Sequence, residues 1–373
     1  MAARPLTVLQ LLPALDAGGV ERSTLEIADA LVRAGHRALV VSAGGRMQPT
    51  LEATGARHIT LDIGRKSLRV FRHVRALRRL LREERVDIVH ARSRLPAWIG
   101  WLALRGMGAT KPRFVTTVHG LNSPSRYSAI MARGDRVICV SKTVRDYVLR
   151  HYPWINPACM RVIPRGIDPL QFPRGDGVDH EARAQIAQRW PQLAGEGPLL
   201  LLPGRGTRLK GHSDALHLLA DLRGDGIDAR LWMPGARVPE RTAYIAELER
   251  EARDLGVIDA LAISEPTNAM ADAYRASDIV LQLSRKPESF GRTVVEALAI
   301  GVPVIGWDHG GVGEVLAALQ PEGRVAPGDR VALAERARAF LLHPPALPQR
   351  IPYTLSAMQQ ATLDVYDELS REQ

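Results

Sequence analysis

The feature that most constrains the fold is a regular alternation between short apolar runs and longer amphipathic stretches. Between the first two apolar runs, residues 20–34 show helical periodicity and end at Gly35, a residue type that commonly closes helices. Short apolar runs separated by helical segments are typical of a parallel sheet with helices on its faces. The runs expected to form strands in the first half are 6–12, 38–41, 86–90, 114–118 and 137–140.

The same alternation begins again after a polar stretch that contains proline and glycine. Residues 161–168 are expected to form a last short strand and turn, and residues 169–179 have the composition of a linker. We therefore predict two doubly wound α/β units, residues 1–170 and 171–345, followed by a terminal amphipathic helix within residues 346–373. Ligands of such folds bind at the carboxyl ends of the strands, which predicts a site in a cleft between the units. The expected strands of the second unit are 199–202, 229–233, 261–264, 279–283 and 302–306.

Composition excludes several classes of protein. Hydrophobic residues make up 46% of the 373 residues and charged residues 24%, which excludes a largely disordered or fibrous chain. Two cysteines provide neither a disulfide framework nor a cysteine-rich metal site. No apolar run approaches the length of a membrane span, and residues 6–15 fit a buried strand better than a signal peptide. We expect a soluble, cytoplasmic protein.

Charge is distributed unevenly between the two halves. Residues 1–170 contain 28 Lys and Arg against 12 Asp and Glu, whereas the remainder contains 22 against 28. A basic half beside an acidic half predicts that the first faces an anionic partner, either nucleic acid or an anionic membrane or lipid acceptor. Aromatic residues amount to only 5%, without a basic ladder interleaved with aromatics, which weakens the nucleic-acid interpretation.

The second unit contains two glutamates, Glu288 and Glu296, around a Ser-Phe-Gly segment, with Gly-Val-Pro-Val following at 301–304. Gly291 is expected to open a helix whose free amide groups face a ligand. A fully helical path would separate the two glutamates by roughly 12 Å, which is more than the spacing of paired glycosidase carboxylates. They are therefore predicted to bind two parts of one long ligand. The simpler alternative is a surface glutamate and an unrelated helix glutamate.

On this block, the chain resembles the retaining nucleotide-sugar glycosyltransferases of the GT-B fold, specifically the glycosyltransferase family 4-like group. That group includes bacterial lipopolysaccharide and phosphatidylinositol mannosyltransferases. The resemblance extends over nearly the whole chain. It implies two Rossmann-like domains facing a central cleft, with the final helix crossing back onto the first domain.

The resemblance also implies roles for individual residues of the block. Glu288 and the backbone amides around Phe290 and Gly291 would hold the hydroxyls of the donor sugar. Glu296 would take the ribose hydroxyls of the nucleotide. Downstream, residues 310–314 resemble the glycine-rich turn and glutamate of the family.

A basic glycine-rich turn, residues 204–211, follows the first apolar run of the second unit. Arg205 offers a forked guanidinium and Lys210 a point charge, which together suit a diphosphate. Such a turn is a weak motif by itself, and it is not a Walker loop because His212 follows Gly211. The resemblance implies that Arg205 and Lys210 bind the pyrophosphate of the donor and stabilise it as it leaves.

Two features of the first unit follow predicted strands. Gly18 and Gly19 allow the backbone to approach a phosphate or sugar closely, although a Gly-Gly pair is often only a turn. His119 follows the run 114–118; an isolated histidine is often structural, but one beside a cleft is placed for function. The resemblance implies that the glycines lie against the donor phosphate and the acceptor, and that His119 contacts the transferred sugar.

A basic helix is expected over residues 65–85, with arginines that include Arg69 and Arg72 on one stripe and apolar residues opposite. This face is either simply solvated or docks on anionic lipid, at about 1 kcal/mol per basic residue. The sequence leaves both interpretations open.

Further arginines are expected near the acceptor. Arg92 and Arg94 follow the run 86–90 and are placed to meet a phosphate or an acidic sugar. Arg165 stands where the resemblance would place an asparagine, which adds a cation before Gly166.

These observations predict a retaining, metal-independent hexosyltransferase of bacterial type. No Asp-x-Asp pair lies at a strand end to hold a divalent cation, so no metal or cofactor is expected, and Arg205 with Lys210 must neutralise the leaving diphosphate. The resemblance implies a front-face mechanism in which the leaving phosphate takes the proton of the acceptor. The expected partners are a nucleotide diphosphate-sugar and an anionic lipid-linked or envelope glycan, and nucleic acid is not expected. The expected pathway is lipopolysaccharide biosynthesis, at the cytoplasmic face of the inner membrane.

Two alternatives belong to other classes. A GT-B-type nucleotide-sugar epimerase would convert its donor with no acceptor present, and the spacing of Arg205 and Lys210 argues against it. A basic nucleic-acid-binding protein on a degenerate fold would bind duplex with a steep salt dependence. The intact donor motifs argue against that second alternative.

Overall fold

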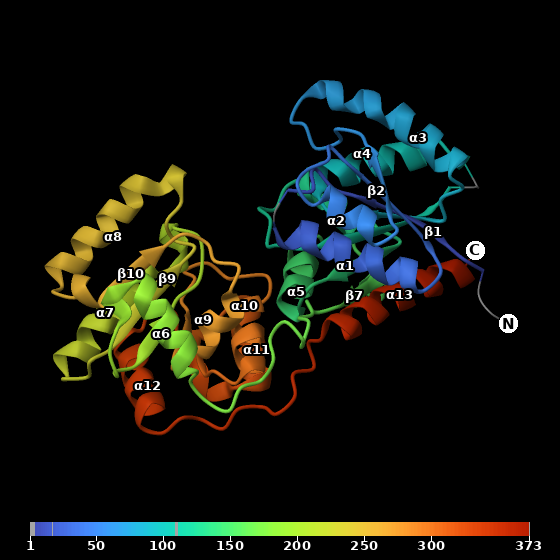
Figure 1. Cartoon of the computed structure of the whole chain (residues 1–373). Coiled ribbons are helices and arrows are strands. Elements are labelled where there is room, and N and C mark those ends of the chain that lie inside the picture. The colour runs from blue at the N-terminus through green and yellow to red at the C-terminus, as the bar shows by residue number, and fades with distance from the viewer. Residues whose placement is uncertain (1–3, 17, 109–110, 373) are drawn as a thin grey trace. The chain divides into compact units, whose positions relative to one another are not determined.

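The computed structural model describes residues 4–16, 18–108 and 111–372 and divides the chain into two compact units (Figure 1). Unit 1 combines Met1–Gly166 with Leu355–Gln373, and unit 2 is Ile167–Thr354. The division falls after residues 166 and 354 rather than after 170 and 345. The reason is local pairing, because the backbone N–H of Ile167 donates to the carbonyl of Tyr353 at 3.0 Å and Ile167 forms a parallel β-bridge with Thr354.

Unit 1 is built on a parallel sheet with the strand order β3-β2-β1-β4-β5-β6-β7. In the register of the sheet, Val8 on β1 lies beside Ala38 on β2 and Ile88 on β4. Strand β3 was not among the expected strands, because three of its four residues are polar and it lies at the sheet edge. The strands are β1 Thr7–Leu11, β2 Arg37–Ser42, β3 Arg57–Thr60, β4 Ile88–Ala91, β5 Arg113–Val118, β6 Arg136–Cys139 and β7 Met160–Val162.

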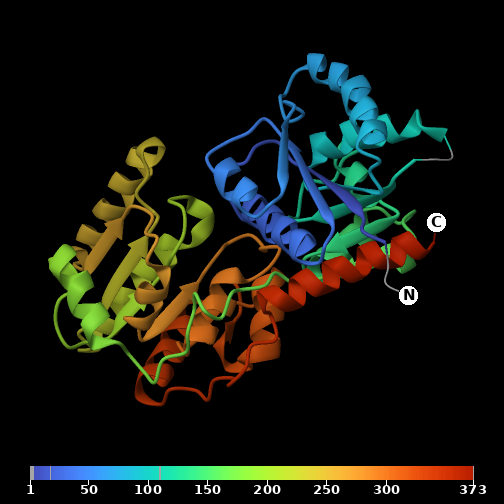
Figure 2. The same ribbon diagram turned by 45° about the vertical axis from the view of Figure 1, so that its right-hand side comes forward.

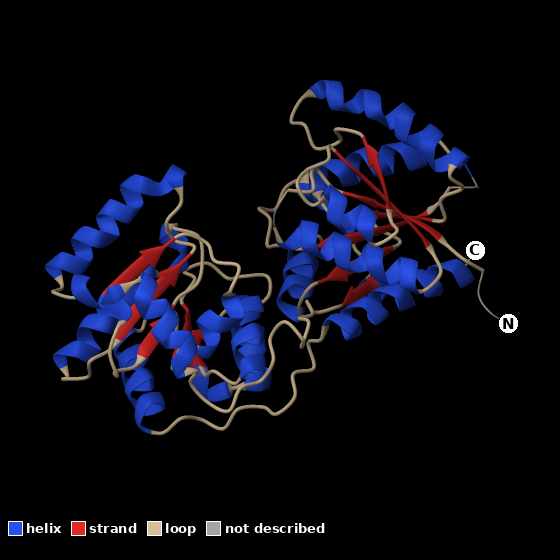
Figure 3. Cartoon of the chain, viewed as in Figure 1, coloured by secondary structure: helices blue, strands red, loops and turns tan. Residues whose placement is uncertain are grey.

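Helices cover both faces of this sheet, as expected for a doubly wound unit (Figure 3). Apart from the edge strands β3 and β7, the strands are almost wholly buried, which explains their continuous apolar runs. The helices of unit 1 are α1 Gly19–Arg33, α2 Gln48–Ala53, α3 His73–Glu83, α4 Arg94–Arg105, α5 Lys142–His151 and α13 Leu355–Arg371, with 3-10 turns that include η1 Leu68–Arg72 and η3 Ser128–Ala132.

The C-terminal helix α13 belongs to unit 1 (Figure 2), although the residues that precede it in sequence belong to unit 2. Its Val365, Tyr366 and Leu369 are buried in the same hydrophobic cluster as Leu31 of α1. On its outer side Glu368 accepts hydrogen bonds from Arg136 at 2.9 Å and from Arg161 at 2.5 Å. The helix is therefore fixed both by apolar burial and by a carboxylate shared between two arginines.

The basic segment 65–85 is not one helix, which corrects the sequence prediction. It consists of η1 followed by α3, and Arg85 ends it with a φ of 49°. Ser67 caps the start of η1, because its side chain accepts a hydrogen bond from the backbone N–H of Arg69. The apolar side is formed by Val70, Leu77 and Leu81, whereas Leu68 points to solvent.

Unit 2 repeats the architecture with the strand order β10-β9-β8-β11-β12-β13, all parallel. Its two-residue strand β13 was not expected from the sequence because it is too short to show a pattern. The strands are β8 Leu199–Leu201, β9 Arg230–Pro234, β10 Leu261–Ser264, β11 Ile279–Gln282, β12 Val304–Trp307 and β13 Arg324–Val325. The helices are α6 His180–Arg189, α7 His212–Gly224, α8 Thr242–Asp254, α9 Met270–Arg275, α10 Arg292–Ile300, α11 Gly310–Leu319 and α12 Arg330–Leu342.

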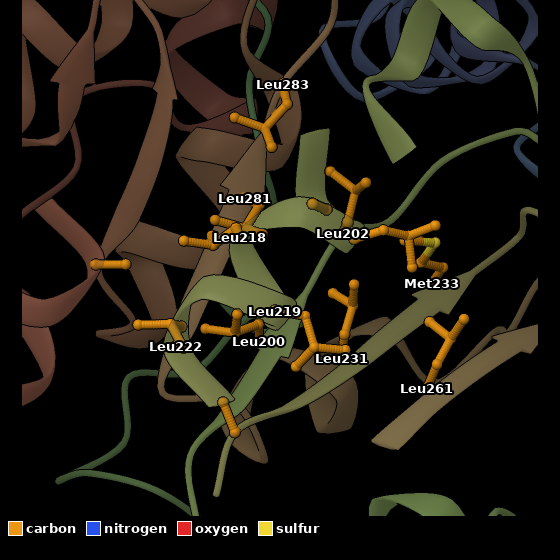
Figure 4. Close-up of a cluster of buried hydrophobic side chains, with 14 of the residues drawn as sticks. Leu200, Leu202, Leu218, Leu219, Leu222, Leu231, Met233, Leu261, Leu281 and Leu283 are labelled. Carbon is orange, nitrogen blue, oxygen red and sulfur yellow. The ribbon is translucent and has the colours of Figure 1, made fainter. Parts of the chain in front are cut away.

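Leucines dominate the core of unit 2 (Figure 4). Leu218 and Leu219 of α7 lie with Leu200 of β8 and Leu231 of β9, and all four are buried. Each such side chain contributes about 1.5–3 kcal/mol on burial. This core fixes the carboxyl ends of β8 and β11, from which the loops of the candidate site emerge.

Within the described residues, no helix combines the length and the apolar character that crossing a bilayer would require.

Candidate functional site

Two loops of unit 2 meet where β8 and β11 end. The loop after β8 contains Arg205 and Lys210, and the loop after β11 leads to Glu288. The backbone N–H of Arg285 donates to the carbonyl of Leu209 at 2.8 Å, which ties the loops together. Gly211 is required at this junction, because its φ is 75° and a Cβ there would lie 2.1 Å from the carbonyl oxygen of Leu283.

The centre of this junction is an ion pair between Lys210 and Glu288. Lys210 Nζ lies 2.5 Å from Glu288 Oε1, and the two side chains are 28% and 25% exposed. The hydroxyl of Ser284 donates to the same carboxylate oxygen and so orients it. The structure thus brings together two residues that are 78 positions apart in sequence, in a place that solvent and a ligand can still reach.

The glycine-rich turn at 310–311 supports Glu288 from behind. The backbone N–H of Gly311, in the first turn of α11, donates to the carbonyl of Glu288 at 2.7 Å. A Cβ on Gly311 would lie 2.4 Å from Phe290 Cα, so a side chain there would displace the glutamate loop. His309 Nε2 also donates to the carbonyl of Ser284 at 2.7 Å.

Phe290 and Gly291 directly precede α10, which begins at Arg292. Gly291 is the N-cap residue, so the helix opens at this glycine as the sequence predicted. The Phe290 ring is buried and packs edge-on against Tyr353, with ring centroids 5.6 Å apart. Its side chain therefore belongs to the core, and only its backbone remains available to a ligand. The donor-sugar role of these amides stays a prediction.

Glu296 lies on α10 and is already held by two partners. It accepts from the Tyr274 hydroxyl at 2.9 Å and from Arg292 Nε at 2.7 Å. Burial, and then the negative charge of Glu296, raise the pKa of Tyr274 well above its usual value, so this phenol remains a donor. The ribose role of Glu296 stays a prediction.

The cations of the loop after β8 differ in their partners. The side chain of Arg205 is exposed and makes no hydrogen bond or ion pair with the described residues. Arg208 pairs with Glu247 and lies over the ring of Tyr244, 5.1 Å from its centroid. Arg208 is thus held by α8, while Arg205 is available to an anion.

In unit 1, Gly18 and Gly19 lie at the start of α1, with Gly18 at the N-cap position and Gly19 as the first helical residue. Among the described residues no side chain caps this end, so its first N–H groups are available to a ligand. The structure places the two glycines at the carboxyl side of β1, as predicted. Their contact with a donor phosphate stays a prediction.

His119 follows β5 and contacts Arg165 from the loop after β7. Its Nδ1 lies at hydrogen-bond distance from Arg165 Nη2, and Arg165 Nη1 contacts the hydroxyl of Ser23 on α1. His119 Nε2 is buried and has no hydrogen-bond partner among the described residues. Burial, and then the positive charges of Arg165 and Arg92, hold the pKa of His119 well below its usual value, so the ring is neutral.

Arg92, which the sequence placed to meet a phosphate or an acidic sugar of the acceptor, is only 4% exposed, so its side chain is not part of the surface of unit 1. Its Nη2 donates to the Ser23 carbonyl at 2.6 Å, and its Nε contacts the Thr24 hydroxyl at 3.3 Å. Burial lowers its pKa to about 10, so it stays charged. A guanidinium enclosed beneath α1 cannot meet a lipid headgroup directly.

The remaining predicted arginines lie at or near the surface. Arg94 begins α4, where it donates to the Ser128 hydroxyl at 3.2 Å and lies 5.3 Å from the centre of the Tyr127 ring. Arg69 and Arg72 are exposed on η1. Their acceptor or membrane roles stay predictions.

Sequence analysis missed two elements of the site. Ser284 was not singled out, although a polar residue directly after an apolar strand marks the carboxyl end where ligands bind. The contact between Arg165 and His119 joins residues 46 positions apart, and only the arginine at an unexpected position hinted at it. Within the described residues, no three His, Cys, Asp or Glu side chains lie close enough to hold a metal ion.

Comparisons with known proteins agree with this architecture. A family model described as Glycosyltransferase Family 4 matches residues 17–170, and one described as Glycosyl transferases group 1 matches residues 185–354. The D-inositol 3-phosphate glycosyltransferase of Streptomyces bingchenggensis is 28% identical in an alignment of 320 residues that covers 76% of this chain and 67% of that protein. The protein of the same name from Actinosynnema mirum is 29% identical in an alignment of 255 residues that covers 61% of this chain and 57% of that protein. The matches therefore span about two thirds of these relatives or less.

Solved structures show the same fold. A glycosyltransferase from Rickettsia africae ESF-5 superimposes with a TM-score of 0.84 at 26% identity over 100% of both chains. Anabaena Alr3699/HepE in complex with UDP gives a TM-score of 0.77 at 18% identity, over 98% of this chain and 99% of that one. Since the two family models take in both units and the Rickettsia structure matches from end to end, this chain belongs to the GT-B glycosyltransferases.

Proposed function

We propose that this chain is a retaining, metal-independent glycosyltransferase that moves a sugar from a nucleotide diphosphate-sugar to a hydroxyl of an anionic acceptor. The curated relatives act as D-inositol 3-phosphate glycosyltransferases, and structural neighbours include HepE bound to UDP-glucose. Other neighbours are WaaG, involved in lipopolysaccharide biosynthesis, and the lipopolysaccharide outer core galactosyltransferase WaaB. A phosphorylated, lipid-linked or envelope glycan acceptor is consistent with all of them.

The observation that carries the proposal is the pair formed by Lys210 and Glu288 where β8 and β11 end. The ammonium supplies up to three donors to a diphosphate, and the carboxylate supplies acceptors to sugar hydroxyls. Arg205, exposed in the same loop, adds a forked donor for the phosphate oxygens. The negative charges of a donor diphosphate and the hydroxyls of its sugar would thus both meet complementary groups within unit 2.

Retention follows in this proposal from a front-face displacement. The bond between the anomeric carbon and the β-phosphate oxygen breaks, and the acceptor oxygen bonds to the same face of that carbon. The acceptor proton goes to an oxygen of the leaving phosphate, while Lys210 and Arg205 stabilise its charge in place of a metal. Glu288, held by Lys210 and Ser284, serves as a sugar-hydroxyl acceptor rather than as a nucleophile.

The test uses thermal unfolding of the full chain with UDP, GDP or ADP at equal excess, with and without EDTA. A ligand at about 100 times its Kd stabilises the folded state by roughly 2.7 kcal/mol. We expect one nucleotide to raise the Tm independently of EDTA, and Lys210→Ala to abolish that rise. A rise that EDTA removes would overturn metal independence, and no rise with any nucleotide would overturn the donor site.

A transfer assay separates this proposal from the epimerase alternative. With donor alone, an epimerase converts its nucleotide-sugar, whereas the proposed transferase leaves it intact apart from slow hydrolysis. Adding inositol phosphate or a lipopolysaccharide-core acceptor should then release nucleotide diphosphate. Retention is read from the anomeric configuration of the new glycoside, and an inverted product would overturn the mechanism.

We also propose that unit 1 attaches to the anionic cytoplasmic face of a membrane, where a lipid-linked acceptor resides. On η1, Leu68 is 84% exposed and Phe71 is 44% exposed, each directly beside an exposed arginine, Arg69 and Arg72 respectively. Exposed apolar side chains among cations favour an interfacial location. Each basic residue near an anionic surface contributes about 1 kcal/mol.

An aromatic surface lies near this basic segment, because α3 packs against α4 and α4 packs against η3. On α4, the rings of Trp98 and Trp101 pack edge-on at 5.5 Å, and Arg105 lies 4.8 Å from the centre of the Trp101 ring. Arg133 lies over both Trp101 and Trp154. Tryptophan and arginine together are typical of surfaces that lie at the headgroup level.

Vesicle flotation tests the membrane proposal. We expect binding to phosphatidylglycerol vesicles but not to phosphatidylcholine vesicles, and roughly 30-fold weaker binding for the double variant Arg69→Ala/Arg72→Ala. The matched control is Arg250→Ala/Arg253→Ala, which changes two exposed arginines at the same spacing on α8 of unit 2. Equal loss in both variants, or binding to duplex DNA in place of vesicles, would overturn it.

A further inference from the structure

Arg165 occupies a defined position between two elements of unit 1. One terminal nitrogen of its guanidinium contacts Ser23 on α1, and the other contacts Nδ1 of His119 after β5. Both partners are therefore bridged by one planar group. The resemblance would place an asparagine here, and an asparagine has no guanidinium with which to form this bridge.

The protons available at this contact determine the tautomer of His119. A guanidinium is always protonated in proteins and has no acceptor. His119 Nδ1 must therefore accept from Arg165, which leaves the proton of the neutral ring on Nε2. That Nε2 is buried and has no partner among the described residues. A buried donor without a partner costs about 1–3 kcal/mol, which a ligand oxygen would recover.

A second arginine holds the first one in place. The oxygen of the Ser23 hydroxyl accepts from Arg92 Nη2 at 3.1 Å as well as from Arg165. Arg92 Nη2 donates also to the Ser23 carbonyl, at 2.6 Å, and Ser23 is buried. Since the fork is planar and anchored at both ends, the ring of His119 has one orientation.

The charged and titratable groups that face His119 are Arg165, Arg92 and His90. His90 is itself neutral, because burial and the charge of Arg92 lower its pKa well below its usual value. Its two ring nitrogens are occupied by the hydroxyls of Tyr366 and Thr117, each at 2.6 Å. No carboxylate faces His119 among these groups, so nothing in its surroundings favours an imidazolium.

We propose that Arg165 is a positioning residue that holds His119 in the tautomer with its proton on Nε2, aimed to donate to an oxygen of the transferred sugar. The inference rests on the proposed function for the identity of that oxygen. The tautomer and its dependence on Arg165 are properties of the protein alone. The two parts can therefore fail separately.

Three substitutions separate the effects of donor and charge. Arg165→Met removes both, Arg165→Gln keeps an amide donor without charge, and Arg165→Lys keeps a charge with a single-point donor. Arg145→Met, which changes a partly exposed arginine on α5, is the matched control. Circular dichroism and Tm identify any variant that fails to fold, and the remaining variants then carry the test.

The direct readout is the ring nitrogen shifts of the full chain labelled with ¹⁵N-histidine, with the His119 signals assigned by their loss in His119→Asn. The wild type should show a protonated Nε2 and an unprotonated Nδ1 across pH 6 to 8. Arg165→Gln should keep this tautomer, whereas Arg165→Met should show exchange between both tautomers. A proton on Nδ1 in the wild type, or an unchanged spectrum in Arg165→Met, would overturn the inference.

Kinetics add a second readout. Loss of alignment at a reacting centre lowers rates by up to about 100-fold, so Arg165→Met should lower kcat while changing the Kd for the nucleotide less than twofold. Removing the neighbouring cation should also raise the pKa of His119, so an acid limb should appear in the pH profile of kcat/KM that the wild type and Arg145→Met lack. A loss of nucleotide affinity with an unchanged pH profile would instead make Arg165 a phosphate ligand. If the wild type transfers no sugar but the spectra are as expected, only the proposed function fails.

Discussion

The two units hold their candidate site residues in opposite ways. In unit 1, Arg92 contacts the carbonyl of Ser23 and the hydroxyl of Thr24, and Arg165 contacts the hydroxyl of Ser23 and the ring of His119. In unit 2, Lys210 is paired with Glu288 at 2.5 Å, and both side chains remain about a quarter exposed. A site of the first kind is preformed by contacts to neutral groups, whereas a site of the second kind is an ion pair in which a ligand can replace one partner.

This difference follows the distribution of charge along the chain. The surplus of basic residues lies in residues 1–170, while the remainder has more acidic than basic residues. Arginines of unit 2 accordingly pair with carboxylates, as Arg338 does with Asp225 and Arg285 with Asp214. The proposed function would therefore depend on buried polar geometry in unit 1 and on an ion pair that can open in unit 2.

The largest expected effect concerns the pair in unit 2. Lys210→Ala should lower kcat by about 10²–10³-fold, because it removes a cation that stabilises the developing phosphate charge. The free energy of unfolding should change by less than about 1 kcal/mol, since a partly exposed ion pair contributes little. Transfer assays and urea unfolding measure the two effects.

The control for this prediction is Lys286→Ala, an exposed lysine in the loop that also carries Glu288. It should leave both quantities unchanged. A Lys210→Ala enzyme with wild-type turnover would contradict the donor-site assignment. A large loss of stability would instead show that the pair is as structural as the network of unit 1.

Much of this arrangement was accessible from the sequence, for identifiable reasons. Parallel strands are buried on both faces, so the runs at 199–202 and 279–283 stand out as apolar, and the loops after them could be found by position alone. Edge strand β3 and the short β13 lack such runs and were missed. Local pattern therefore predicts the scaffold and the loops, because both depend on burial that repeats along the chain.

What the sequence could not predict is the pairing of side chains over long separations. The hydrogen bond between Tyr366 and His90 spans 276 residues, and nothing local to either residue indicates it. The burial of Arg92 was missed for the same reason, since an arginine after a strand is usually exposed. The break between η1 and α3 was missed because the arginine spacing continues through it.

The second prediction concerns a buried titratable group of unit 2, which its partly exposed ion pair does not involve. His212, at the start of α7, is buried, and burial lowers its pKa to about 4. Its unfolded pKa is about 6.5. The unfolded state therefore binds the proton first, so stability is fully present above pH 6.5 and is lost as the pH falls toward 4.

The loss should reach on the order of 3 kcal/mol below pH 4, and His212→Gln should flatten the slope of unfolding free energy between pH 6.5 and 4. Urea unfolding at a series of pH values measures the slope. His217→Gln is the control, because that imidazole is partly exposed beside Glu251. An equally steep slope in His212→Gln would assign the acid sensitivity to other groups, with the buried His90 and His119 of unit 1 first among them.

The third prediction tests the buried network of unit 1. Tyr366→Phe removes the hydroxyl that contacts His90 Nδ1 at 2.6 Å and leaves a buried ring nitrogen without that partner. The free energy of unfolding should fall by about 1–3 kcal/mol. Tyr127→Phe, which removes a hydroxyl from an exposed ring, should have no comparable effect. Equal stabilities for the two variants would mean that the geometry of unit 1 does not depend on α13.

The smallest effect is expected where the two units should behave alike. Arg79 pairs with Glu83 at 3.8 Å on α3 of unit 1, and Arg338 pairs with Asp225 at 2.5 Å in unit 2; all four side chains are at least one-third exposed. Solvent and salt screen such pairs, so each Arg→Ala substitution should change the unfolding free energy by no more than about 0.5 kcal/mol. The shorter distance in unit 2 should not matter, because the entropy lost in fixing two long side chains offsets the gain in Coulomb energy. Urea unfolding at 20 mM and 500 mM salt measures both effects. A loss of unfolding free energy above 1 kcal/mol for Arg338→Ala that high salt does not reduce would mean that unit 2 depends on its ion pairs for folding. In that case the pair of Lys210 and Glu288 could not open without weakening the fold.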